Sequence, residues 1–235
     1  GEGVLHRAPA LFKEYFPNRK AVIVADNNTW KAAGEAVDAS MREAGIPCER
    51  FLIEEEEFHA DWPYVERIDE MLDRTGAVAV AVGSGVINDL CKLASGAVVS
   101  RDGAKLNIET HAPLVILADV GVLAAAPKEM TAAGYADLAA KIPAGAEWMI
   151  ADLFGTEPII PAAWNVFMND LDAMLADPEG VAAGKPEAIA SLFAGLTLSG
   201  IAMQVAKSSR PASCTEHLFS HVLDMTHHRY NGKFQ

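Results

Sequence analysis

The chain has 235 residues, a formal net charge of −13 and 51% hydrophobic residues. This length fits one large domain or two small ones, and the apolar fraction is high enough for a sizeable core. The negative charge argues against binding to nucleic acid or to an anionic membrane surface, because both need a basic face.

The cysteines and the amino terminus indicate a cellular compartment. The three cysteines share no metal-binding spacing and are typical of reduced thiols. The first residues lack the apolar core of a signal peptide, and no apolar run appears long enough to span a membrane. We therefore expect a cytoplasmic protein that binds neither membrane nor nucleic acid.

The first half alternates between strand and helix patterns. Short apolar runs at 20–26, 50–53 and 77–82 predict strands, and helical spacing covers 30–44 and 61–74. Repeated strand–helix units with right-handed crossovers build an open parallel sheet of the Rossmann-like α/β class. Ligands of such sheets lie beyond the carboxyl ends of the strands.

A glycine turn follows the strand predicted at 77–82. Gly83-Ser84-Gly85 lies directly before a helical segment at 86–93, and Asp26 ends the first strand. Glycines allow backbone N–H groups to approach an anion, and a helix N-terminus favours negative charge. The motif is short, so an ordinary strand–helix turn with convenient glycines remains an equal alternative.

The second half changes character. Residues 113–119 predict the last strand of the first domain, and after Pro127 the strand patterns nearly vanish. We expect an α/β domain at 1–126 and an all-helical domain at 127–235. Pro143 and Gly145 predict a kink or break after the first helix of this domain. Helices are predicted at 128–141, 161–175, 187–207 and 216–228.

Two features of the helical half suggest a metal site. His217 and His221 are four residues apart, so that both project from one face of a helix. Two such imidazoles can bind one metal, or one can bind the metal while the other contacts a substrate. Asp137 stands alone among small apolar residues, and a buried carboxylate needs a cation. A pair of exposed histidines and a surface aspartate remain alternatives.

These motifs occur together in a characteristic order, at residues 24–29, 83–89, 124–130, 133–137 and 216–221. Together they resemble the superfamily that joins iron-containing alcohol dehydrogenases, glycerol dehydrogenase and 3-dehydroquinate synthase. Within it, the strongest resemblance is to the sn-glycerol-1-phosphate dehydrogenase branch. The resemblance implies a dehydroquinate synthase-like fold, with a Rossmann-like domain before an all-helical one, and a homo-oligomer.

The resemblance also implies roles for the residues. Gly83, Ser84, Gly85, Val86 and Ile87 would cradle the pyrophosphate of NAD or NADP, with Asp26 beside the nucleotide. In the helical half, Asp137 and His217 would bind one divalent metal, expected to be zinc, and His221 would contact the substrate. The implied reaction interconverts dihydroxyacetone phosphate and sn-glycerol 1-phosphate.

The chain departs from the resemblance in two places. The superfamily carries a further strand and a covering loop after the helix of the glycine turn, whereas here Gly96 leads directly to Ala97-Val98-Val99. The third metal ligand, a histidine beyond His221, is not found. We expect that the sequence represents part of a longer chain, with a break between about Ala94 and Val98.

Other functions remain open at this stage. Glycerol dehydrogenase differs in lacking a phosphate pocket, and a 3-dehydroquinate synthase-type carbon–oxygen lyase shares both cofactor and metal. The lyase branch usually has glutamate where this chain has Asp137, which weighs against it. A non-catalytic binding protein is favoured only if the chain truly lacks the third ligand and the covering loop.

Overall fold

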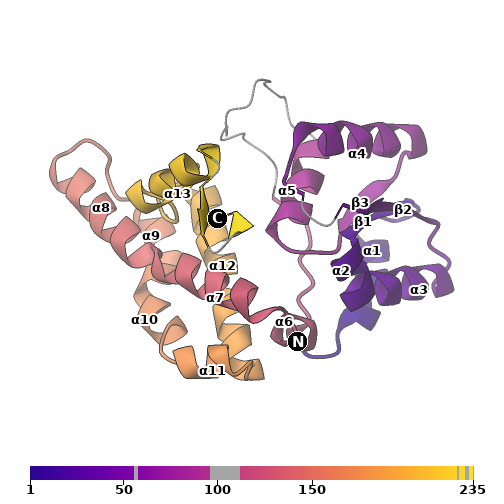
Figure 1. Cartoon of the computed structure of the whole chain (residues 1–235), viewed down its shortest axis with the longest axis horizontal. Coiled ribbons are helices and arrows are strands. Elements are labelled where there is room, and N and C mark those ends of the chain that lie inside the picture. Colours follow the sequence, from indigo (N-terminus) through magenta and orange to yellow (C-terminus); the bar gives the residue numbers. More distant parts are fainter. Residues whose placement is uncertain (56–57, 96–111, 227, 231–232, 235) are drawn as a thin grey trace. The chain divides into compact units, whose positions relative to one another are not determined.

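Two compact units make up the chain (Figure 1). The division falls between Val122 and Leu123, shortly before the expected boundary. The amino-terminal part is called the sheet unit here, and the carboxyl-terminal part the helical unit. The computed structural model describes residues 1–55, 58–95, 112–226, 228–230 and 233–234. The join expected between Ala94 and Val98 lies largely outside these residues.

A three-stranded parallel sheet forms the centre of the sheet unit, in the order β2-β1-β3. The strands are β1 (Ala21–Asp26), β2 (Cys48–Ile53) and β3 (Val78–Ala81). Ala21 pairs with Cys48 on one side and with Val78 on the other. Because the chain leaves β1 toward β2 on one side and then returns to β3 on the other, the strand order reverses between β1 and β3. Such a reversal is where open α/β sheets bind ligands.

Helices cover both faces of this sheet (Figure 1). Val22 and Val24 of β1 share a core with α4 and α5, while Ala21 and Ile23 share a second core with α1 and α3. All four β1 side chains are fully buried, as expected for a central parallel strand. The helices are η1 (Leu5–Arg7), α1 (Ala8–Tyr15), α2 (Asn27–Thr29), the π-helix η2 (Trp30–Gly34), α3 (Glu35–Glu43), α4 (Trp62–Thr75), α5 (Gly85–Ala94) and α6 (Val120–Ala124), of which α6 crosses the division.

The prediction of a strand at 113–119 is wrong. This segment is irregular, and Leu114 and Ile116 are exposed. Its last residue, Asp119, accepts hydrogen bonds from the backbone N–H groups of Gly3 and Leu5. The segment therefore ends by binding the amino-terminal residues through a carboxylate, and an apolar run without a neighbouring strand to pair with does not form a sheet strand.

Long helix α12 (Pro186–Ala206) organises the helical unit. It packs against α7, α9, α10 and α11. A Cβ atom at Gly195 would lie 2.8 Å from the Leu138 side chain of α7, so a larger residue here would force that side chain to move. The other elements are α7 (Lys128–Ala139), α8 (Lys141–Leu153), α9 (Pro161–Phe167), η3 (Met168–Asp170), α10 (Leu171–Met174), α11 (Pro178–Ala182), α13 (Thr215–Met225), β4 (Arg229–Tyr230) and β5 (Lys233–Phe234).

The expectation that no apolar run could span a membrane needs correction. By length and composition alone, α12 is long and apolar enough to cross a membrane, with a mean hydropathy of 1.7 over its most apolar stretch. The core helix of a globular unit meets the same measure. In this structure α12 buries Ile189, Leu192 and Ala202, and 33% of its most apolar stretch is buried.

The break predicted in the helical half is present, but not at Pro143. Helix α7 ends at Ala139 and α8 begins at Lys141, so the interruption lies at Ala140. Pro143 falls in the first turn of α8, where backbone N–H groups have no partner within the helix. The proline is therefore accommodated by the start of a new helix.

A buried carboxylate joins α3 to β2 in the sheet unit. Asp38 is 3% exposed and binds the guanidinium groups of Arg42 and Arg50. The Arg50 guanidinium also stacks over the Trp30 ring, 4.7 Å from its centroid. Burial raises the pKa of the Asp38 carboxyl, but hydrogen bonds from the two arginines outweigh it and the net pKa is lowered.

We predict that Asp38→Asn lowers the free energy of unfolding at pH 7 by about 2 kcal/mol, because it removes charge-assisted hydrogen bonds. The lowered pKa means that this stability is present above the unfolded-state value of roughly 3.9 and is lost as pH falls through the folded-state pKa. Urea unfolding from pH 7 to pH 3 measures it. If the difference in unfolding free energy between the unchanged chain and Asp38→Asn stayed constant down to pH 3, the stabilising role of the ionised Asp38 would be contradicted.

Candidate functional site

The glycine turn lies where the strand order reverses. Val82 extends the pairing of β3 with β1 through a 2.9 Å hydrogen bond to Val24, and the turn Gly83-Ser84 leads into α5. Asp26 ends β1, the neighbouring strand. The sheet therefore brings Asp26 and the glycine turn to the same edge, as expected from their positions after parallel strands.

The carbonyl groups of the glycine turn are hydrogen-bonded, whereas the start of the following helix is open. The Asn88 side-chain amide donates to the carbonyls of Gly83 and Ser84, at 3.3 and 3.0 Å. A Cβ atom at Gly83 would lie 2.6 Å from the Ile87 side chain, whereas one at Gly85 would meet nothing within 4 Å. Ser84 is the N-cap of α5, but its side chain makes no capping hydrogen bond. The helix start is thus free of a side-chain acceptor and accessible to an anion.

Two residues predicted to contact the nucleotide also have local structural roles. Ile87 is 1% exposed and belongs to the core between the sheet and α4, so only its backbone is available to a ligand. Asp26 caps α2: its Oδ1 accepts from the N–H groups of Asn28 and Thr29, at 2.7 and 3.0 Å. Val86 is partly buried, and Gly83, Ser84 and Gly85 are exposed.

In the helical unit, the structure brings Asp137 and His217 together. Asp137 lies on α7 and His217 on α13, and Asp137 Oδ1 is 3.3 Å from His217 Nε2. Two ligands bound at 2.0–2.2 Å to a tetrahedral zinc ion are roughly 3.4 Å apart. The spacing of this pair therefore fits a shared metal ion.

Glu216 sets the orientation of the His217 ring. Its Oε1 is 2.8 Å from His217 Nδ1 and also accepts from the Cys214 N–H. Burial raises the pKa of the Glu216 carboxyl, but these hydrogen bonds outweigh it and the net pKa is lowered. An ionised carboxylate only accepts, so Nδ1 carries the hydrogen. Histidine ligands of metals are typically held this way.

This arrangement leaves the contact between His217 Nε2 and Asp137 Oδ1 in need of a cation. Nδ1 faces Glu216, and Nε2 lies 3.3 Å from the Asp137 carboxylate, whose oxygens only accept. A proton or a metal cation is needed between them, because two lone pairs at this distance repel. The donor set, one carboxylate oxygen and one imidazole nitrogen, suits zinc. Among the described residues no group of three potential ligands is assembled.

The structure adds a residue that the sequence pattern did not single out. The Lys141 side chain is 2% exposed, and its ammonium donates to Asp137 Oδ1 at 2.9 Å. The spacing Asp137-x-x-x-Lys141 is an ion-pair signal along a helix and could have indicated the contact. His221 lies on α13 one turn after His217 and is partly buried.

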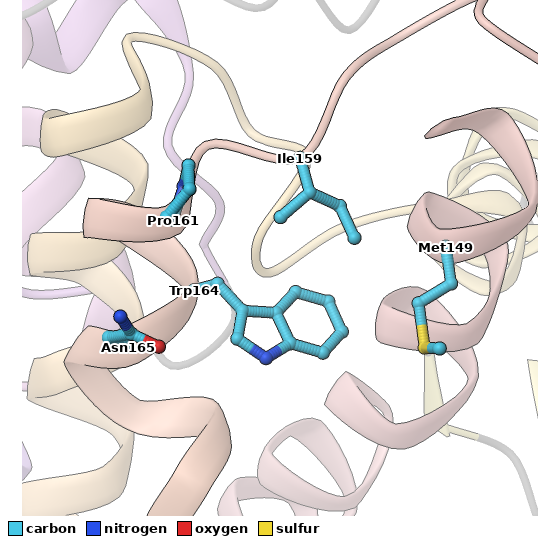
Figure 2. A pocket seen from close by; sticks show the side chains of 5 residues that line it. All are labelled: Met149, Ile159, Pro161, Trp164 and Asn165. Atoms are coloured by element: carbon cyan, nitrogen blue, oxygen red, sulfur yellow. The ribbon is translucent and has the colours of Figure 1, made fainter. Parts of the chain in front are cut away.

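A separate hollow of about 310 Å³ lies between α8 and α9 (Figure 2). Figure 2 shows the Trp164 indole pointing across the hollow toward Met149, below Ile159, with Asn165 as the polar member of the lining. Trp164 also contacts the buried ring of Trp148, at a centroid distance of 5.9 Å. The lining includes neither Asp137 nor His217, and it offers no group suited to acid–base or metal chemistry.

Comparison with known proteins identifies the family. Residues 1–98 match the family described as iron-containing alcohol dehydrogenase. Proteins named glycerol-1-phosphate dehydrogenase, with NAD(P)+ in their names, are similar over most of the chain. The one from Halalkalibacterium halodurans is 31% identical over 89% of this chain and 59% of its own length. The one from Geobacillus thermodenitrificans is 30% identical over 95% of this chain and 62% of its own length.

An archaeal relative shows the same similarity over a larger share of its length. The glycerol-1-phosphate dehydrogenase of Pyrococcus horikoshii is 31% identical over 96% of this chain and 70% of its own length. The chain spans about six-tenths of the length of the two bacterial relatives. The order of elements in the sheet unit and the similarity across both units agree: the chain belongs to the iron-containing alcohol dehydrogenase family.

Proposed function

We propose that this chain acts as an NAD(P)-dependent, metal-assisted oxidoreductase that interconverts dihydroxyacetone phosphate and sn-glycerol 1-phosphate. The observation that carries the proposal is the Asp137–His217 pair, with Nε2 held toward a carboxylate oxygen at 3.3 Å. The names of the relatives support the substrate and the cofactor class. A small phosphorylated substrate, a homo-oligomer and a cytoplasmic location belong to the same proposal, and the three buried cysteines, which are free, are compatible with that location.

The sheet unit would hold the nucleotide at the glycine turn. Gly85 leaves open space at the start of α5, so that backbone N–H groups can reach the pyrophosphate. Asn88 donates hydrogen bonds to the two carbonyls of the turn and would thereby satisfy these acceptors when an anion binds nearby. Asp26, at the end of the adjacent strand, would lie beside the nucleotide. The nicotinamide itself carries the hydride, and the protein supplies orientation.

The helical unit would hold the metal through Asp137 Oδ1 and His217 Nε2. When bound, a divalent ion supplies Lewis-acid stabilisation for the substrate oxygen. Glu216 keeps the hydrogen on Nδ1, which maintains Nε2 as a ligand atom. His221, one turn further along α13, would contact the substrate.

The activity is tested by following NADH and NADPH oxidation on the chain, with and without zinc. We expect oxidation with dihydroxyacetone phosphate and a strong dependence on metal, because the carboxylate–imidazole pair is built for a cation. Dihydroxyacetone serves as the matched substrate without phosphate. Equal rates with the two ketones would favour a glycerol dehydrogenase, and absence of turnover in a zinc-loaded chain would contradict the proposed reaction.

For the cofactor turn, we predict that Gly85→Val weakens NAD(P)H binding at least tenfold, because its side chain would fill the space that the pyrophosphate needs. Fluorescence titration measures the affinity, and circular dichroism checks that the fold is kept. Gly200→Val is the matched control, since that glycine is equally open and lies on α12. Unchanged affinity in the Gly85 variant would refute the assignment.

For the metal site, we predict that Asp137→Asn and His217→Gln each weaken zinc binding by 10-fold or more, because each removes one of two protein ligands. Competition with a chromogenic chelator measures the affinity. Asp172→Asn, on an exposed stretch of α10, and His6→Gln, in the sheet unit, are the controls. The site assignment fails if the ligand variants bind zinc as tightly as the controls do.

A further inference from the structure

Lys141 is the feature of the helical unit that the proposed chemistry leaves unexplained. Its side chain is 2% exposed, which makes it one of the largest buried side chains among the described residues. Lysine is rarely buried unless it is paired, because removing an ammonium from water is costly. Its partner is Asp137 Oδ1, the same oxygen that faces His217.

The backbone explains how the ammonium reaches this oxygen. Asp137 lies near the end of α7, the chain turns at Ala140, and Lys141 is the first residue of α8. The pair has the spacing of neighbours on one helix, yet Lys141 starts a new helix whose first turn contains Pro143. The long basic side chain reaches back one turn, to the last turn of α7, and is buried there.

Both nitrogen contacts of the Asp137 carboxylate are to the same oxygen, Oδ1. Oδ1 receives the Lys141 ammonium at 2.9 Å and has His217 Nε2 at 3.3 Å. A carboxylate oxygen has lone pairs for two partners, so that both contacts can persist. The Asp137 side chain is 45% exposed, which leaves it accessible, while the Lys141 side chain is buried.

We propose that Lys141 is a positioning residue of the metal site: its ammonium holds Asp137 Oδ1 toward His217 Nε2, so that the two ligand atoms are at metal-binding distance before an ion arrives. The inference rests on the proposed function, because it requires that this pair binds a metal. Lys141 acts through Asp137 and touches neither metal nor substrate. Partners of ligating carboxylates typically change metal affinity by 10- to 100-fold.

Repulsion between the Lys141 ammonium and a bound zinc ion alone would predict the opposite effect on zinc affinity. If Lys141 only neutralised the Asp137 charge, its removal would free the carboxylate and tighten zinc binding. If it served only packing, its removal would lower stability and leave zinc affinity unchanged. The direction of the change in affinity therefore distinguishes the three roles.

The experiment measures zinc affinity of the metal-stripped full chain by chelator competition, with thermal unfolding and circular dichroism in parallel. We expect Lys141→Met to weaken zinc binding 10- to 100-fold and Lys141→Gln, which keeps a donor without the charge, to weaken it less. Lys185→Met is the matched control, because that lysine is exposed at the start of α12. In an Asp137→Asn background, Lys141→Met is expected to change zinc affinity no further.

The outcomes separate this inference from the proposed function. Equal zinc affinity of the unchanged chain and Asp137→Asn would contradict the metal site itself. Wild-type or tighter affinity in the Lys141 variants, with Asp137→Asn impaired, would overturn the positioning role alone. Loss of cooperative unfolding in both Lys141 variants would also overturn it, since the ammonium would then serve the fold.

Discussion

One carboxylate oxygen, Asp137 Oδ1, is the atom around which side chains from three helices of the helical unit meet. It faces an ammonium from the start of α8 and an imidazole nitrogen from α13. The Lys141 ammonium is buried and needs an anionic partner, which the half-exposed Asp137 carboxylate provides, so that side chains of α7, α8 and α13 meet at this oxygen. The ammonium comes from the first residue after the break at Ala140, and the imidazole is also in contact with Glu216.

The two units fix the side chains and turns of the proposed sites by the same physical means. In the sheet unit, the ends of β1 and β3 fix Asp26 and the glycine turn, and Asn88 holds the carbonyls of that turn. In the helical unit, helix ends and one neighbouring carboxylate fix the atoms proposed as metal ligands. In both units the fixed groups lie at the ends of regular elements, where backbone and side-chain atoms are not consumed by the internal hydrogen bonds of the element.

Much of the fold could be predicted because the relevant signals are local. The apolar runs at β1 and β3 and the glycines after β3 predict two parallel strands and a glycine turn without any knowledge of contacts, although only the apolar residues of β1 are fully buried. The segment 113–119 has the same apolar pattern but forms no strand, since pairing depends on a neighbour that the pattern does not contain. Asp119 binds the amino-terminal backbone instead, which is a long-range contact.

The candidate metal pair, Asp137 and His217, could be proposed from residue types, whereas the buried Lys141 that contacts Asp137 could not. Asp137 and His217 are distant in sequence, and their approach depends on how α13 packs beside α8. Lys141 looked unremarkable because an acid and a base four residues apart usually form a solvated surface pair. Its burial arises only when the surrounding helices pack, and Pro143 indicated the region of the break but not its position at Ala140.

The contact between Gly83 and Ile87 has a consequence for protein engineering. A Cβ atom at Gly83 would collide with a side chain of the sheet core, while Gly85 faces open space and Ser84 is exposed. A mutant library at this turn would therefore tolerate substitution unequally at the three positions. Substitutions at the second and third positions would test the proposed nucleotide contact, whereas substitutions at the first would mainly cause folding defects, so a library is best restricted to Ser84 and Gly85.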